Sequence, residues 1–594
     1  MLNDKGLRSF SEGTHDRLWE HMGAHLVRGG AEFSVWAPRA DEVAVAGTFS
    51  GGEPAPLKKG ACGVWTGAVS GVRPGSEYKY RIRALGREYW KADPLAFYSE
   101  AHPGTSSVVW DLHYDWNDRD WMKWRRGTGD EALSIYEMHL GSWRRTPEEE
   151  GARPMSYRDI APQLAHYLKQ TGFTHVELMP VMEHPFYGSW GYQATGYFAP
   201  THRYGTPQDL MYLIDLLHRE GIGVILDWVP SHFAGDPHGL AEFDGGPLYE
   251  SGETVHRGSH AFDYTRGEVR SFLRSSAAFW LDVYHADGLR LDAVAGIRER
   301  RGGAAFLREL NGALSKHFPQ AIKIAEDSSS EPAVTAGASE GGLGFDRKWD
   351  MGWMHDTLSY MMVPPAGRAS HHQRLTFRPM YMWNERWVLP LPHDEVKHPL
   401  GSLFSKMPGS GPQKFANLRL LLAWMYAQPG AKLLFMGGEF GEPGEWQPDR
   451  ALDWRVLERA ENFGVRTLVE TLNRVYRAES ALHEAEDDLR SFKWIECCDE
   501  AHSTVSFLRR GRTDAATLLA VFNFSNSALP DYRIGVPFGW MWKRVLSTDE
   551  FKFGGGGRGV VDRVYVEKVE WQNHLQSIRV LLPPLTALWL KAEE

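Results

Sequence analysis

Strand-length apolar runs alternate with segments of helical periodicity between residues 133 and 440, and this alternation constrains the fold more than any other feature. Few residues in these runs are polar enough to face water. Strands without a polar face are typical of a parallel sheet that helices cover on both sides. The eight runs are SIYEMHL (134–140), HVELMPV (175–181), GVILDWV (223–229), GLRLDAV (288–294), IKIAED (322–327), FDRKWDM (345–351), WVLPLPHD (387–394) and KLLFMGGEF (432–440).

Helical patterns lie between several of these runs, for instance DLMYLIDLLHREG (209–221) and VRSFLRSSAAFWLDVYH (269–285). Eight such units in about 310 residues fit a (β/α)8 barrel, for which ~250 residues are typical. An open doubly wound sheet fits less well, because no glycine-rich phosphate-binding turn follows the first strand. The sequence therefore predicts a central (β/α)8 TIM barrel.

The flanking regions have β patterning. Residues 30–110 hold short alternating runs split by Gly and Pro, which predicts a β-sandwich. A polar stretch with several Trp (116–132) is interpreted as a linker, and the runs after residue 480 predict a C-terminal antiparallel β-sandwich. The expected domains are an N-terminal segment with its sandwich, the barrel and the C-terminal all-β domain, at 1–115, 116–480 and 481–594.

Composition excludes several classes of protein. The net charge is −10 and no block of Lys and Arg resembles a phosphate-binding surface, so no nucleic-acid partner is expected. Cys62, Cys497 and Cys498 predict neither a disulfide framework nor a metal site, and no cofactor is expected. The N-terminus lacks the pattern of a signal peptide, and no apolar stretch is long enough to span a bilayer. A soluble cytoplasmic protein without a membrane partner is predicted.

Ionisable residues collect at the carboxyl ends of four predicted strands, where barrels of this type place their chemistry. A structural ion pair would explain any one of them, but four strands that deliver acids, bases and cations to one rim favour a reaction site. These residues are Asp227 and His232 in DWVPSH, Arg290 and Asp292 in GLRLDAV, Glu326 in AED, and His393 and Asp394 in PHDE.

Carboxylates gathered in this way, without Cys or His at metal-binding spacing, suit glycosidic bond cleavage. One carboxylate attacks the anomeric carbon while a protonated carboxyl donates to the leaving oxygen, and a retaining reaction needs the two ~5–5.5 Å apart. Neighbouring strands lie ~4.8 Å apart, so Asp292 and Glu326 can meet this spacing. Arg290 faces the same side as Asp292 and is expected to orient it.

The motifs DWVPSH, GLRLDAV, AED and PHDE, in this order, resemble the four signature regions of the α-amylase superfamily. The resemblance implies that Asp292 is the nucleophile, Glu326 the general acid/base and Asp394 the carboxylate that stabilises the transition state. It also implies a set of substrate-binding residues, with a tyrosine from GSWGYQATGYFAPTHRYGT among them: Tyr192, Asp227, His232, Arg290 and His393.

Longer strings, such as GFTHVELMPVMEHPFYGSWGYQATGYFAPT and QKFANLRLLLAWMYAQPGAKLLFMGGEFGE, are similar to the bacterial 1,4-α-glucan branching enzymes of this superfamily. This resemblance implies a glucan-binding N-terminal sandwich and a protein that acts on glycogen, amylose or amylopectin-like glucan. A monomer is expected. Such an enzyme cleaves α-1,4 bonds with retention and transfers the chain to a 6-hydroxyl, which forms the α-1,6 branch points of glycogen.

Two alternatives share the motifs. A hydrolase of the superfamily, such as a debranching enzyme or a maltooligosyl-trehalose trehalohydrolase, would let water intercept the intermediate. A glucan-binding protein with an inactive barrel is the other, against which the intact acidic residues argue. The loops that flank the site depart from the family pattern in IRERRGGAAFLREL, KHPLGSL and GGEFGEPGEW, so transferred chain length and acceptor choice stay open.

Overall fold

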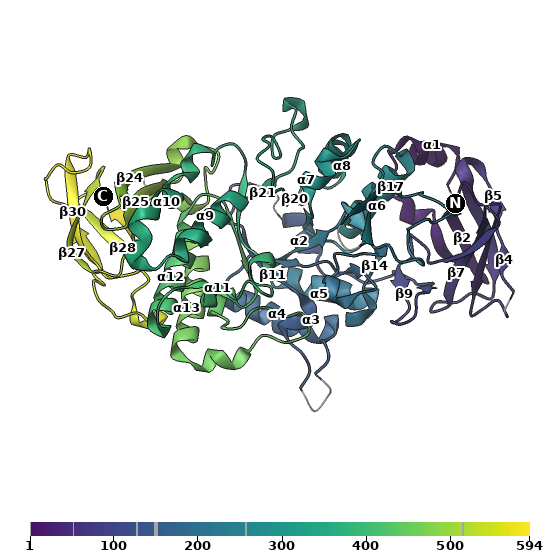
Figure 1. Cartoon of the computed structure of the whole chain (residues 1–594), viewed down its shortest axis with the longest axis horizontal. Coiled ribbons are helices and arrows are strands. Elements are labelled where there is room, and N and C mark those ends of the chain that lie inside the picture. The colour runs from purple at the N-terminus through teal and green to yellow at the C-terminus, as the bar shows by residue number, and fades with distance from the viewer. Residues whose placement is uncertain are drawn as a thin grey trace. The chain divides into compact units, whose positions relative to one another are not determined.

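Figure 1 shows the computed structural model, which describes residues 2–51, 53–125, 129–147, 152–255, 258–513 and 516–593. Its contacts divide the chain into two compact units, each built from three segments. Unit 1 comprises Met1–Gly127, His139–Ala165 and Glu177–Asp346, and unit 2 comprises Thr128–Met138, His166–Val176 and Arg347–Glu594.

Eight parallel strands form a closed barrel, around which they follow one another in chain order. Nearly all of their residues are buried, as expected of strands that are covered on both faces. Each strand lies within a predicted run or starts one residue before it, so the prediction of a TIM barrel is confirmed. The strands are β11 (Ser134–Met138), β12 (His175–Leu178), β15 (Gly223–Trp228), β19 (Gly288–Leu291), β20 (Ile322–Ala325), β21 (Arg347–Trp349), β22 (Trp387–Leu391) and β23 (Ala431–Phe435).

Helices of unit 1 that follow its barrel strands include α5 (Pro207–Arg219), α6 (Gly267–Asp282), α7 (Val294–Glu299) and α8 (Gly303–His317). Helix α5 begins two residues before its predicted start, because Thr206 and Asp209 form a reciprocal capping box and Pro207 occupies the first turn. The segment that follows β19 forms the short helix α7 and the longer helix α8.

The N-terminal module of unit 1 is the predicted β-sandwich. One sheet has the order β1 (Gly23–Val27), β2 (Gly30–Trp36), β6 (Val64–Ser70) and β5 (Lys58–Lys59). The second contains β3 (Glu42–Gly47), β7 (Glu77–Ala84), β8 (Arg87–Lys91) and the short β4 (Ala55–Pro56), β9 (Tyr98–Ser99) and β10 (Ser107–Val108). Strand β7 shows why they pack: Tyr78, Tyr80, Ile82 and Ala84 are buried and their neighbours are not, which gives one apolar face. Helix α1 (Asp4–Glu12) precedes the module and contacts α6.

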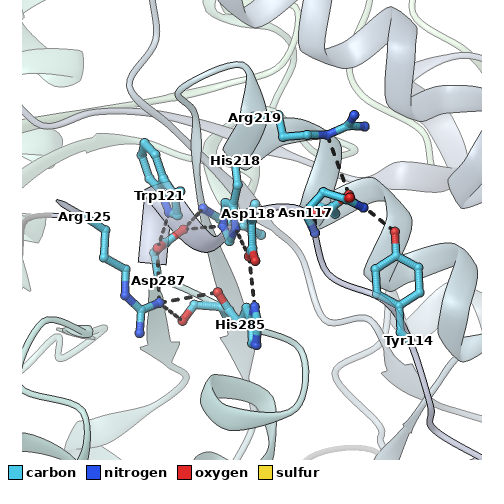
Figure 2. A network of polar contacts seen from close by, with 12 residues as sticks. Tyr114, Asn117, Asp118, Trp121, Arg125, His218, Arg219, His285 and Asp287 are labelled. Carbon is cyan, nitrogen blue, oxygen red and sulfur yellow. Dashed lines mark hydrogen bonds and ion pairs between the residues drawn. The ribbon is translucent and has the colours of Figure 1, made fainter. Parts of the chain in front are cut away.

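The stretch at 116–132, which the sequence predicts to be a linker, follows the sandwich and precedes β11, and its residues 126–128 lie outside the described part of the chain. It contains helix α2 (Arg119–Trp124) and a buried polar network, which Figure 2 shows. Asp118 Oδ2 lies 2.8 Å from Nδ1 of His218 on α5, whose Nε2 lies 2.9 Å from Asp287 Oδ2. The indole of Trp121 also donates to Asp287, at 2.8 Å. Asp118 and Trp121 therefore pair inside unit 1.

Unit 2 carries the helices α9 (Met351–Met361), α12 (Gly411–Ala427) and α13 (Ala460–Ala478) and ends in the predicted antiparallel β domain. Its larger sheet has the order β24 (Phe492–Asp499), β25 (Thr504–Arg510), β26 (Thr517–Asn523), β31 (Thr586–Glu593), β28 (Met541–Ser547) and β29 (Arg563–Tyr565). Strands β27 (Leu529–Val536) and β30 (Gln576–Leu582) form a second, two-stranded sheet. Trp542, Val521 and Ile534 are fully buried in the shared core. Among the described residues, no helix has both the length and the apolar character that crossing a bilayer requires.

Candidate active site at the strand ends

Arg290 is the centre of a buried ion-pair cluster in unit 1. It lies on β19 directly beside Asp227 on β15, because the two residues are register partners in the parallel sheet. Arg290 Nη1 lies 2.9 Å from both carboxylate oxygens of Asp227, and the two side chains are each only 1% exposed. Burial of a charge is costly unless it is paired in this way.

Asp292 follows the end of β19 and lies on the same guanidinium. Arg290 Nη1 is 3.0 Å from Asp292 Oδ1, and the hydroxyl of Ser231 lies 3.4 Å from Oδ2. The next residue, Ala293, has a left-handed φ of 52°, which costs a non-glycine residue of order 1 kcal/mol. This sharp turn ends the strand and leaves the Asp292 side chain 16% exposed. The carboxylate is thus held from one side and accessible from the other.

Glu326 follows the adjacent strand β20 and is tied to the same turn. Its Oε2 accepts a hydrogen bond from the backbone N–H of Ala293 at 2.8 Å and lies 3.9 Å from Arg290 Nη2. Its own N–H donates to the carbonyl of Leu291 at 3.0 Å. Three carboxylates from three neighbouring strands therefore lie within 4 Å of one guanidinium.

Tyr192 and Asp227 form the inner wall of this cluster. The Tyr192 hydroxyl donates to Asp227 Oδ2 at 2.5 Å, and its ring lies 5.9 Å from the Arg290 guanidinium carbon. Burial raises the pKa of the Asp227 carboxyl to about 7, and Asp292 adds to the rise while Arg290 opposes it.

His232 completes the part of the site that lies in unit 1. Its Nδ1 lies 2.8 Å from the Ser231 hydroxyl, and Ser231 in turn contacts Asp292. Burial lowers the pKa of His232, which favours a neutral imidazole that can donate and accept a hydrogen bond. Its backbone carbonyl accepts a bond from the hydroxyl of Tyr197 at 2.8 Å, which fixes the loop after β15.

His393 and Asp394 lie in unit 2, at the end of β22. The backbone N–H of His393 donates to Glu137 on β11 at 2.9 Å, and its Nδ1 lies 2.5 Å from the other oxygen of the same carboxylate. Glu137 is completely buried. Asp394 is 41% exposed, and Lys397 Nζ lies 2.5 Å from its Oδ1. Glu137 is not among the predicted site residues, although an acidic residue inside a buried strand is itself a signal.

The structure thus brings six predicted site residues together in unit 1 and two in unit 2. The six are Tyr192, Asp227, His232, Arg290, Asp292 and Glu326, and the two are His393 and Asp394. In the described part of the chain, no group of three or more His, Cys, Asp or Glu is arranged to hold a metal ion. These side chains can donate protons, accept protons and supply a positive charge.

Three family models match the chain. The catalytic domain of α-amylase matches residues 158–242, carbohydrate-binding module 48 (the isoamylase N-terminal domain) matches residues 21–96, and the C-terminal all-β domain of α-amylase matches residues 494–593. Among solved structures, the apo pullulanase of Paenibacillus barengoltzii has a TM-score of 0.75 at 20% identity, with 100% of this chain and 96% of that chain covered. The pullulanase of Anoxybacillus sp. LM18-11 has a TM-score of 0.74 at 19% identity, with coverage of 99% and 89%. These structures share the fold.

Much higher identity links the chain to proteins named 1,4-alpha-glucan branching enzyme GlgB. The one from Aquifex aeolicus is 48% identical, with 100% of this chain and 99% of the relative covered. The proteins from Aromatoleum aromaticum and Myxococcus xanthus are 48% and 45% identical, with 100% and 99% of this chain and 97% and 85% of the relatives covered. The chain therefore belongs to the GlgB family of 1,4-α-glucan branching enzymes.

Proposed function

We propose that this protein is a 1,4-α-glucan branching enzyme that cleaves an α-1,4 bond with retention and transfers the released chain to a 6-hydroxyl of an α-glucan. Identity of 43–48% to branching enzymes along the full chain supports the substrate and the reaction. The observation that carries the mechanism is the cluster in which Arg290 contacts carboxylates from three adjacent strands.

In the first step, the Asp292 carboxylate attacks C1 of the donor sugar. The bond between C1 and the leaving O4 breaks, and Glu326 in its acid form gives its proton to that oxygen. The product is a glycosyl ester of Asp292. Arg290 orients the attacking carboxylate through the 3.0 Å contact, and the Ala293 N–H directs Glu326.

In the second step, the Glu326 carboxylate takes the proton of the acceptor's 6-hydroxyl. The acceptor O6 attacks C1, the ester bond breaks, and Asp292 returns to its carboxylate form, so configuration is retained after two inversions. We assign Asp394 to the transition state, where its negative charge stabilises the positive charge that develops on the sugar. Tyr192, Asp227, His232 and His393 are proposed to bind the reacting sugar.

The three domains are proposed to have separate roles. We assign glucan binding to the N-terminal domain (1–115), the reaction to the barrel (116–480) and a supporting role to the C-terminal domain (481–594). The matches to carbohydrate-binding module 48 and to the C-terminal domain of α-amylase fall inside the first and last of these ranges. We further propose that the protein acts as a monomer in the cytoplasm, without nucleic-acid or membrane partners.

Incubation with amylose tests the reaction. Branching lowers the iodine absorbance with few new reducing ends and creates links that isoamylase cleaves, whereas hydrolysis raises reducing ends in step with cleavage. The variant Asp292→Asn should lose activity by at least about a thousandfold, since the covalent step needs the carboxylate. The matched variant Asp115→Asn, whose side chain is 96% exposed, should retain full activity. Comparable activity in both variants would refute the assignment of Asp292.

A further inference from the structure

A second concave site lies in the C-terminal domain, at residues that the proposed reaction does not use. A cavity of about 830 Å³ is lined by residues of β24, β27 and β30 and by the turn at 571–574. The volume falls within the ~300–1,000 Å³ of typical ligand pockets. It combines one large aromatic ring, that of Trp571, with polar side chains such as Asp499, Tyr532 and Arg579.

The aromatic ring is presented by a tight hairpin turn. Trp571 and His574 exchange two backbone hydrogen bonds of 2.9 Å, and the two residues between them have left-handed φ values of 48° and 61°. Such values at both central positions are typical of a type I′ turn. The turn lies against β27, because Gly535 leaves room for it: a Cβ there would be 2.3 Å from the Trp571 carbonyl oxygen. The backbone is thus fixed while 48% of Trp571 stays exposed.

A second contact fixes the turn to β24. The side-chain amide of Gln572 donates to Glu496 at 2.9 Å, and its oxygen accepts from the Gly535 N–H at 2.9 Å. The exposed ring of Trp571 on this rigid support offers an apolar face that a ligand inside the cavity can cover.

The charged side chains that line the cavity have hydrogen-bond or ion-pair partners, as Glu496 has in Gln572. Asp499 accepts a hydrogen bond of 2.7 Å from the Tyr532 hydroxyl and contacts His502 Nδ1 at 2.8 Å. Arg579 forms an ion pair with Asp531. Arg533 lies 2.7 Å from Glu567, which is outside the lining. Both guanidinium groups of the lining are therefore paired, which disfavours an anion, whereas a neutral ligand rich in hydroxyls finds many donors and acceptors.

We propose that this cavity is a second, non-catalytic binding site for α-glucan, in which a sugar ring stacks on Trp571 and its hydroxyls bond to the paired polar side chains. A pyranose has an apolar C–H face and a rim of hydroxyls, which matches an aromatic ring surrounded by polar groups. The cavity is larger than one such ring, so the ligand is a segment of chain. The identity of the sugar rests on the proposed function; the class of ligand rests on the cavity.

Fluorine NMR of the full chain labelled with 5-fluorotryptophan tests the site directly. The background is Asp292→Asn, so that the added sugar is not consumed. The resonance that disappears in Trp571→Tyr belongs to Trp571, and the one that disappears in Trp540→Tyr belongs to a control, since Trp540 is 56% exposed but outside the cavity. Maltoheptaose should shift the Trp571 resonance saturably and leave that of Trp540 in place, and the β-linked cellohexaose should shift neither.

Affinity electrophoresis through a gel that contains glycogen measures how strongly each variant binds the polysaccharide. Removing the ring in Trp571→Ala should weaken binding at this site about tenfold, as expected for the loss of a central aromatic contact, whereas Trp571→Tyr should keep most of it. Equal retardation of Trp571→Ala and Trp540→Ala, or a Trp571 resonance that maltoheptaose does not move, would overturn the site. A shifted Trp571 resonance in a protein whose wild type does not branch amylose would instead overturn the proposed function alone.

Discussion

Replacement of His218 by Gln should remove a specific part of the pH dependence of stability. His218 is fully buried between Asp118 and Asp287, at 2.8 and 2.9 Å (Figure 2). Burial opposes its charge, but the two carboxylates outweigh this effect and raise the pKa of His218 to about 9. Burial likewise acts to raise the pKa of Asp118, but the hydrogen bonds from His218 and His285 lower it to about 2.

The magnitude follows from linkage. A tenfold change in proton affinity is worth about 1.4 kcal/mol, so raising the pKa of His218 from 6.5 to about 9 stabilises the folded protein by about 3 kcal/mol. Because the folded state binds the proton more tightly, this stabilisation is complete below pH 6.5 and disappears as the pH rises through about 9. In the His218→Gln variant the side chain cannot titrate, so the contribution is absent at every pH.

Urea unfolding of the wild type and His218→Gln, read by pulse proteolysis between pH 6 and 9.5, measures the difference in the free energy of unfolding. This difference should shrink by about 3 kcal/mol between pH 6.5 and 9. His317→Gln is the matched control, because His317 is 50% exposed and lies 3.7 Å from its carboxylate partner Asp16. A wild-type-minus-variant difference that is constant over this pH range would show that His218 is neutral when folded and refute the reasoning.

Two further predictions concern packing and the support of the candidate site. Gly267→Ala should destabilise the protein by about 1–3 kcal/mol in urea unfolding, because its Cβ would lie 1.9 Å from the carbonyl oxygen of Ser11 on α1. Gly312→Ala, in open space on α8, should instead stabilise by about 0.5–1 kcal/mol, and equal effects would contradict the packing argument. Glu137→Gln should lower kcat for amylose roughly 10–100-fold, because His393 loses a charged partner worth about 1.5–3 kcal/mol. If Glu137 positions His393, the pH dependence of kcat should change in the variant as well. A reduced kcat with an unchanged pH dependence would instead indicate that part of the variant protein is unfolded.

The barrel was predictable because each strand is a nearly unbroken apolar run, which is a local signal. The residues at which the strands and helices begin and end were harder to predict. The apolar run predicts a strand over 345–351, but β21 covers only Arg347–Trp349 and α9 starts at Met351, since Asp350 caps this helix by accepting from Trp353 N–H. Capping depends on a few hydrogen bonds that the apolar pattern does not reveal.

The buried contacts of the predicted linker at 116–132 could not be predicted for a related reason. Within it, Asp118 pairs with His218, 100 residues away, and Trp121 with Asp287, 166 residues away. Burial of a polar residue depends on partners that only the fold brings together. The same holds for Glu137, whose partner His393 is 256 residues distant. By contrast, Arg290 and Asp292 are two residues apart on one strand, so their pairing could be predicted from alternation alone.

The left-handed turn at Ala293 has a consequence for how the two acidic groups can move. Glu326 is hydrogen-bonded to Leu291, Ala293 and Val294, the residues that flank Asp292 on both sides. Any displacement of this strand end carries both carboxyl groups along as one rigid piece. Their mutual spacing should therefore persist through fluctuations of the surrounding loops, which leaves those loops free to diverge in sequence while the chemistry stays constant.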